Sequence, residues 1–182
     1  AVWQTLSSHE PFDVPVDEFE DKMLNSMYFA DCCIARVVEG LRQTPEWNNT
    51  LVVIIADHAY KYPYGASASA VIRHRMWLGG AVAEPMVVEE YCSQSDFAAT
   101  LLAQMGIDHS AYTLSRDVFS ADRRKKFGYY TFNNGFGVVD STQNVVFDCT
   151  SSRVLSDSLA SEELVTIGKT LLQTTYKNIR EL

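Results

Sequence analysis

The stretch LVVIIADH, residues 51–58, places an acid and an imidazole directly after a run of apolar residues. A run this short, rich in Val and Ile, is typical of a strand buried on both faces, and such strands belong to parallel sheets covered by helices. Asp57 and His58 then lie at the carboxyl edge of the sheet, where open α/β sheets bind ligands. The sequence therefore predicts an α/β fold with a candidate site at the end of this strand.

Asp57 and His58 have two interpretations when taken alone. A carboxylate oxygen and a neutral imidazole nitrogen both coordinate divalent cations, and neighbouring residues just after a strand converge on one cation if the backbone turns there. In the alternative, Asp57 caps the next segment and His58 lies at the surface. The dipeptide leaves both interpretations open.

The composition and charge of the chain limit the classes of protein to which it can belong. The chain has 182 residues, of which 47% are hydrophobic and 12% aromatic, enough for one globular domain with a core. A formal charge of −8 disfavours a nucleic-acid surface, and the only clustered basic run, residues 123–126, is short. No apolar stretch approaches the roughly 20 residues that span a bilayer, so we expect no membrane span. The four cysteines fit no zinc-finger spacing.

Periodicity predicts an alternation of strands and helices in the first two thirds of the chain. Residues 2–7 are predicted as a strand, 19–43 as a long amphipathic helix and 51–56 as the next strand, which together make a right-handed crossover. A short strand at 76–78 ends at two glycines, and a helix follows over 93–105. Because Ala1 has no Met before it and the first strand is already under way, we expect further sequence to precede this chain.

The last third has a different pattern. Three short apolar segments separated by turn residues predict an antiparallel meander, with turns at 133–135 and 141–143. A final helix is predicted over 161–179. We therefore divide the chain into residues 1–120, an α/β part, and residues 121–182, the meander and terminal helix packed on the same domain.

Polar clusters fall at the ends of the predicted strands, and their order along the chain resembles a known family. The stretches SSHEPF, NNTLVVIIADH, MWLGG and YCSQSDFAATLLAQMGI resemble the carboxyl-terminal half of the sulfatase-like domain of the alkaline phosphatase superfamily. The branch that resembles them most contains lipoteichoic acid synthases and other phosphoglycerol or phosphoethanolamine transferases. The resemblance covers roughly residues 2–120. It implies a three-layer α/β/α sandwich of alkaline phosphatase type, here with an antiparallel β extension and a C-terminal helix.

The resemblance assigns roles to residues of this chain. Asp57 and His58 match a pair that binds a divalent cation (manganese, zinc, magnesium or calcium) together with an upstream acid and a Thr or modified Cys nucleophile, neither of which this chain supplies. His9 matches a His that contacts the phosphate or sulfate group. His74 matches a further substrate-binding His less closely, so Arg73 or Arg75 could equally contact the anion. Ala59 departs from the family, which has Gly after the Asp-His pair, and this leaves the site geometry open.

These assignments predict part of a metal-dependent sulfatase-like hydrolase or phosphotransferase. Its substrate would be a sulfate or phosphate ester, with a lipid head group as one possibility. The protein would be located at the outer face of a bacterial membrane, where the parent proteins of this branch are anchored. The isolated chain is expected to be inactive, and to self-associate through an exposed sheet edge. The rival hypothesis is a non-catalytic ligand- or partner-binding domain that retains the fold.

Overall fold

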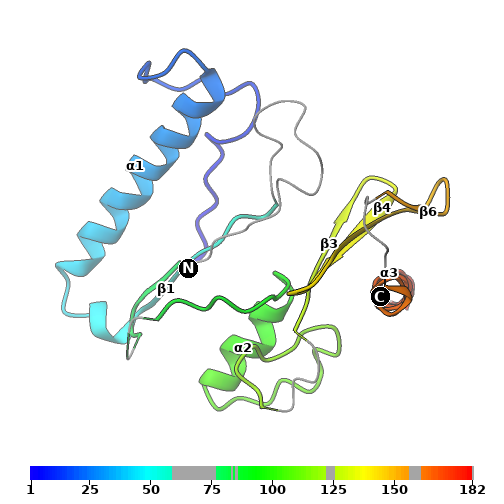
Figure 1. The fold of residues 1–182 in the computed structure, drawn as a ribbon. Coiled ribbons are helices and arrows are strands. Elements are labelled where there is room, and N and C mark those ends of the chain that lie inside the picture. Colours follow the sequence, from blue (N-terminus) through cyan, green and yellow to red (C-terminus); the bar gives the residue numbers. More distant parts are fainter. Residues whose placement is uncertain (59–76, 83, 85, 122–125, 156–160, 182) are drawn as a thin grey trace. The chain divides into compact units, whose positions relative to one another are not determined.

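The computed structural model describes residues 1–58, 77–82, 84, 86–121, 126–155 and 161–181 (Figure 1). The chain forms two compact units, Ala1–Ile55 with Arg75–Pro85 and Ala56–His74 with Met86–Leu182. Each unit combines two separate stretches of sequence. The sequence-based division at residue 120 separates two continuous segments, whereas each compact unit joins segments that contact one another in the fold. The predicted domain division stays a prediction.

The long helix of the first unit, α1, spans Lys22–Arg42 and confirms the predicted amphipathic helix. It begins after Asp21, whose side chain accepts a hydrogen bond from the backbone N–H of Met23 and so satisfies one of the unpaired donors of the first turn. Asn25 is buried and bonds the preceding loop, accepting from the N–H groups of Glu18 and Phe19. Capping by Asp21 explains why the helix starts a few residues later than periodicity indicates.

The apolar run that suggested the fold forms a strand, but not the predicted one. β1 (Leu51–Ile54) pairs antiparallel with β2 (Trp77–Gly80), and Leu51 and Ile55 are 37% and 39% exposed. The prediction of a parallel strand buried on both faces is therefore wrong for this chain. An apolar run specifies that a strand forms, whereas the direction of the neighbouring strand depends on how the chain returns to it.

The glycine pair that ends β2 allows a close approach of two backbones. Gly80 has a φ of +76°, and a Cβ at this position would lie 1.9 Å from the carbonyl oxygen of Thr50. The next residue, Ala81, donates its N–H to the same oxygen at 3.0 Å. Thr50 follows the short 3-10 helix η1 (Trp47–Asn49), so the glycine joins the turn before β1 to the end of β2.

Residues 2–7 do not form the predicted strand. These residues pair with no strand among the described residues, and Val2, Trp3 and Leu6 are 99%, 55% and 73% exposed. Without a strand before α1 in the described residues, the right-handed crossover is not formed either. Strand propensity reflects how well a residue fits a half-buried pleated surface. Because no described strand lies beside residues 2–7, their propensity alone does not make them a strand.

The second unit is built around an antiparallel sheet and confirms the predicted meander and final helix. The strands are β3 (Gly128–Phe132), β4 (Gly135–Val139), β5 (Asn144–Asp148) and β6 (Arg153–Val154), in that order across the sheet. The helix α3 (Glu162–Glu181) packs on β4 and β5 (Figure 1). The core between them contains Phe127, Phe136, Val138, Val145, Phe147 and Leu164.

The helix and sheet fit closely at one point. The Phe136 ring is fully buried, stacks on Phe147 with ring centroids 5.2 Å apart, and lies against Gly168 of α3, where an added Cβ would be 2.0 Å from the ring. Both predicted turns are present: Asn134 adopts a φ of 65°, and the Asp140 carboxylate accepts N–H bonds from Thr142 and Gln143. Short connections and alternating apolar residues make this part readable from sequence.

Candidate functional site

Asp57 and His58 lie side by side shortly after β1. Asp57 Oδ2 is 3.7 Å from His58 Nε2, and the two side chains are 81% and 71% exposed. The backbone N–H of His58 donates to Asp57 Oδ1 at 2.9 Å, which holds the carboxylate over the turn. The pair therefore presents an oxygen and a nitrogen donor to solvent from one short turn.

The donor atoms of this pair fit a cation. Two protein ligands about 2.0–2.2 Å from one metal ion, at the tetrahedral angle, lie about 3.3–3.6 Å apart. The 3.7 Å between Asp57 Oδ2 and His58 Nε2 is close to that separation. A hard oxygen and an imidazole nitrogen suit zinc or manganese. Among the described residues, no group of three or more His, Cys, Asp and Glu side chains is placed to hold a metal ion.

The turn is anchored by a residue that the sequence did not single out. The side-chain amide of Gln94 donates from Nε2 to the carbonyl oxygen of Ala56 at 2.6 Å, and the same nitrogen lies 3.4 Å from the carbonyl oxygen of Asp57. An exposed Gln far along the chain carries no local signal of such a contact. The bond follows from the fold, which brings the start of the next helix beside this turn.

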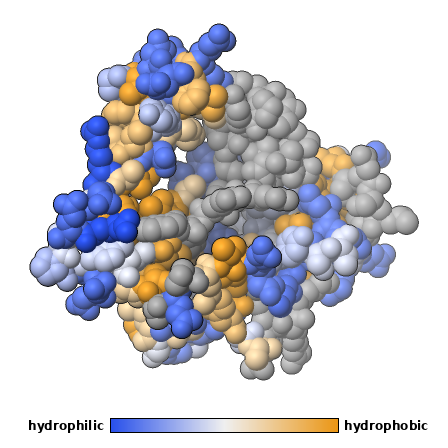
Figure 2. Space-filling model, turned by 60° about the vertical axis from the view of Figure 1, so that its left-hand side comes forward, coloured by the Kyte–Doolittle hydropathy of each residue, from blue (hydrophilic) through white to orange (hydrophobic). Residues whose placement is uncertain are grey.

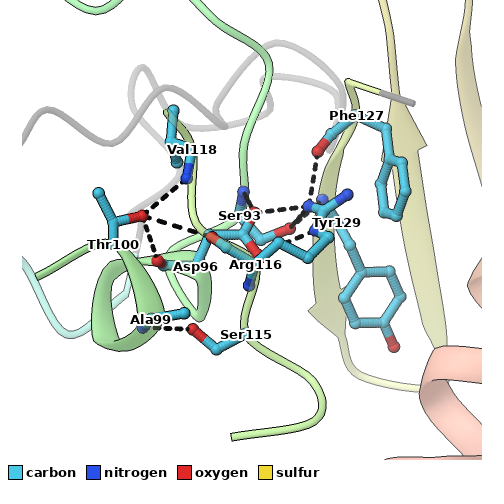
Figure 3. Close-up of polar contacts among 9 residues, drawn as sticks. All are labelled: Ser93, Asp96, Ala99, Thr100, Ser115, Arg116, Val118, Phe127 and Tyr129. Carbon is cyan, nitrogen blue, oxygen red and sulfur yellow. Dashed lines mark hydrogen bonds and ion pairs between the residues drawn. The ribbon is translucent and has the colours of Figure 1, made fainter. Parts of the chain in front are cut away.

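That helix, α2, spans Asp96–Gln104, and the buried Asp96 in its first turn forms an ion pair with Arg116. The Asp96 carboxylate is 1% exposed and accepts from Arg116 Nε at 3.0 Å, from Arg116 Nη2 at 2.5 Å and from the N–H of Ser93 at 2.9 Å (Figure 3). The backbone N–H of Arg116 donates to the same carboxylate. Because each oxygen has donors, the charge is compensated where it is buried.

The ion pair also ties α2 to the sheet. Ser93 Oγ accepts the N–H of Tyr129 in β3 at 2.8 Å, and Arg116 Nη2 donates to the carbonyl of Phe127 at 2.9 Å (Figure 3). The guanidinium carbon of Arg116 lies 3.7 Å from the centroid of the Phe127 ring. The loop that carries Gln94 is therefore held between a helix and a strand.

The placement of the other predicted site residues next to this pair stays a prediction. His9 belongs to the first unit, is exposed, and donates from Nδ1 to the carbonyl oxygen of Glu10 at 2.8 Å. Its contact with a phosphate or sulfate group stays a prediction. His74, Arg73 and Arg75 lie outside the described residues, as does Ala59.

Comparison with protein families gives the relationship. A family model described as Sulfatase matches residues 1–107, more than half of the chain. The chain belongs to the sulfatase family. The matched residues include His9, Asp57, His58 and the whole of α2. The exposed donor pair therefore lies within the part of the chain that the Sulfatase model matches.

The structure of this sulfatase-family chain also has a known counterpart. A protein of the alkaline phosphatase superfamily from Vibrio parahaemolyticus matches it with a TM-score of 0.76 at 18% sequence identity. The match covers 97% of this chain and 48% of that one, so the chain spans about half the length of its structural relative. The predicted alkaline phosphatase type of α/β fold is confirmed. The lipoteichoic acid synthase branch is not distinguished by either comparison.

One further comparison and one property of the helices complete the description. A search of curated protein sequences gives no significant match. Within the described part of the sulfatase-family chain, no helix combines the length and apolar character needed to cross a bilayer.

Proposed function

We propose that this chain contributes part of the metal and anion site of a sulfatase-like hydrolase or phosphotransferase. The observation that carries the proposal is the Asp57–His58 turn, which exposes two metal-binding donor atoms 3.7 Å apart in a member of the sulfatase family. The reaction would be sulfate-ester hydrolysis or transfer of a phosphoglycerol- or phosphoethanolamine-type group. Asp57 and His58 are the residues that would hold the cation.

The chemistry follows from the charge of the transferred group. Phosphoryl and sulfuryl groups carry negative charge on their non-bridging oxygens, and a bound divalent cation would neutralise that charge and lower the pKa of an attacking hydroxyl. His9 would donate a hydrogen bond to one of those oxygens, with His74, Arg73 or Arg75 as further donors. The nucleophile, a Thr or modified Cys by resemblance, would come from another part of the protein, and water or an acceptor alcohol would complete the transfer.

The setting of the reaction is also part of the proposal. Its substrate would be a sulfate or phosphate ester, including a lipid head group, and its location would be extracytoplasmic.

Large apolar side chains lie exposed in both units, and Figure 2 shows hydrophobic residues at the surface of one face. In the first unit they include Val2, Trp3, Leu6, Leu51 and Leu78. Such a surface favours self-association of the isolated chain.

The test uses the protein that contains the complete domain. Its metal content is measured, and activity is assayed with a panel of phosphodiesters and sulfate esters. The double variant Asp57→Ala/His58→Ala is expected to lose bound metal and to lower kcat/KM by at least about 100-fold, because removal of a metal ligand removes the charge stabilisation in the transition state.

The chain offers a matched control in its second Asp-His pair. Asp108 accepts two hydrogen bonds from Ser110 and lies after α2, and Asp108→Ala/His109→Ala removes the same two side-chain types. This control should keep metal and activity. Equal loss in both double variants would contradict the proposal. Ligand binding without turnover by the complete domain would favour the non-catalytic rival.

A further inference from the structure

We propose that Gln94 is the positioning residue of the Asp57–His58 turn, and that it sets the direction in which both donor side chains point. The inference rests on the proposed function, because it assigns Gln94 a role toward the cation that Asp57 and His58 would hold. It concerns a contact within the second unit, where all three residues lie.

The geometry of the contact restrains the backbone of Asp57 on both sides. Gln94 Nε2 is 2.6 Å from the carbonyl oxygen of Ala56 and 3.4 Å from that of Asp57. These two carbonyls belong to the planar peptide groups on either side of the Asp57 Cα. Restraining both planes restrains φ and ψ of Asp57, and with them the directions of its side chain and of His58.

The backbone next to Gln94 is held in place by hydrogen bonds to α2 and β3. Ser93, the residue before Gln94, donates its N–H to the buried Asp96 carboxylate and accepts the N–H of Tyr129 on its hydroxyl. Arg116 closes this network on Asp96. A donor that must hold a site turn is effective only if its own position is fixed, and here a helix start and a strand fix it.

The residue type suits the task. A glutamine amide supplies N–H donors without adding charge, so it can bond two carbonyls beside a cation site without changing the charge of that site. A lysine would repel a nearby cation, and a glutamate would place acceptor against acceptor at the 2.6 Å contact. Methionine has similar length and no donor, which makes Gln94→Met the variant that removes only the bond.

The experiment compares Gln94→Met with Gln104→Met in the 182-residue chain. Gln104 is exposed at the far end of α2, so it controls for the loss of an amide from the same helix region. Amide hydrogen exchange is measured by NMR at His58, whose N–H donates to Asp57 Oδ1. Mn²⁺ is then added alone, and the concentration that broadens the Asp57 and His58 signals is determined. The unfolding midpoint is recorded for every variant.

The expected result is a local effect without global destabilisation. Gln94→Met should speed exchange at the His58 amide about three- to tenfold, which corresponds to the loss of one hydrogen bond. The Mn²⁺ concentration needed for broadening should rise about tenfold, as when a supporting contact of a metal ligand is lost. Gln104→Met should change neither, and both variants should unfold at nearly the wild-type midpoint.

The outcomes separate this inference from the proposed function. Unchanged exchange at His58 in Gln94→Met, or an equal change in Gln104→Met, overturns the positioning role. Faster exchange at His58 with no Mn²⁺ broadening even in the wild type supports the restraint of the turn and overturns the role of Gln94 toward a cation in this chain, while the proposed function is tested separately by the metal content of the complete domain. Faster exchange with unaltered Mn²⁺ broadening overturns the role of Gln94 toward the cation.

Discussion

The β3–β6 sheet and the β1–β2 pair differ in how completely this chain builds them. In the sheet, neighbouring strands follow one another along the chain, α3 covers one face, and Phe136, Val138 and Val145 are fully buried. In the pair, the strands are separated by residues 55–76, and Leu51 and Leu78 remain 37% and 38% exposed. The sheet therefore contributes most of the stability, whereas the candidate metal ligands, Asp57 and His58, follow the exposed β1 strand in the sequence.

The largest expected effect comes from the centre of the sheet. Phe136→Ala should lower the free energy of unfolding by about 3–5 kcal/mol, because it removes a buried ring and leaves a cavity against Phe147 and Gly168. Leu78→Ala in β2 should cost less than about 1 kcal/mol, because part of that side chain is already in water. Urea denaturation followed by circular dichroism measures both. Equal losses would remove the contrast between the two regions.

The next effect concerns the ion pair at the start of α2. Arg116→Met should cost about 3 kcal/mol, because it leaves the Asp96 carboxylate buried with only backbone donors. Asp96→Asn should cost less, since the Arg116 side chain, unlike the Asp96 carboxylate, is partly exposed and keeps its hydrogen bond to the Phe127 carbonyl oxygen. A double-mutant cycle measured by urea denaturation gives the coupling. A larger loss in Asp96→Asn than in Arg116→Met would contradict this asymmetry.

A smaller, pH-dependent effect should arise in β3. Burial, with minor contributions from Cys149 and Tyr176, raises the pKa of Tyr129 to about 12 from an ordinary value near 10. The folded state then holds the phenolic proton more tightly than the unfolded state, so its contribution is complete below pH 10 and is lost as the pH rises from 10 to 12. Stability should therefore fall over that range. Phenolate absorbance and urea midpoints follow it.

Tyr129→Phe is the control for that pH dependence. Within the described residues the Tyr129 hydroxyl is buried without a hydrogen-bond partner, so its removal should cost little at neutral pH. The variant should flatten the decline between pH 10 and 12. Burial also raises the pKa of Tyr130, so a residual slope in the same direction is expected. A full decline in Tyr129→Phe would assign the effect to other groups.

The sequence predicted elements well where their partners are close along the chain. The meander could be read because its turn residues, such as Asn134, join strands that pair with their neighbours. The strand at Leu51–Ile54 could be read as a strand, but its antiparallel partner could not, because direction depends on a distant segment. Residues 2–7 have strand composition and no strand, which shows that propensity without a paired strand is insufficient.

The candidate site divides in the same way. Asp57 and His58 were found because an apolar run leads directly into them, and the structure places their donor atoms together. Gln94 was not found, since its bond to the Ala56 carbonyl depends on the packing of α2. The Asp96–Arg116 ion pair was missed for the same reason: two oppositely charged residues 20 positions apart have no common motif. Donor residues next to one another in the sequence can be predicted from the sequence, whereas the residues that position them depend on tertiary contacts.

The smallest expected effect on stability is at the candidate ligands themselves. Asp57→Ala/His58→Ala should change the free energy of unfolding by less than about 0.5 kcal/mol, because both side chains are more than two-thirds exposed and their ion pair is a surface one. The same variant should abolish whatever weak Mn²⁺ or Zn²⁺ binding calorimetry detects in the wild-type chain, where two ligands leave most of the coordination shell to water. Side chains that lie at a surface turn without contributing to folding can bind a ligand at no cost to stability. If the double variant instead unfolds like Arg116→Met, the pair is part of the packing of this turn, and the contrast between a stabilising sheet and an exposed functional turn fails.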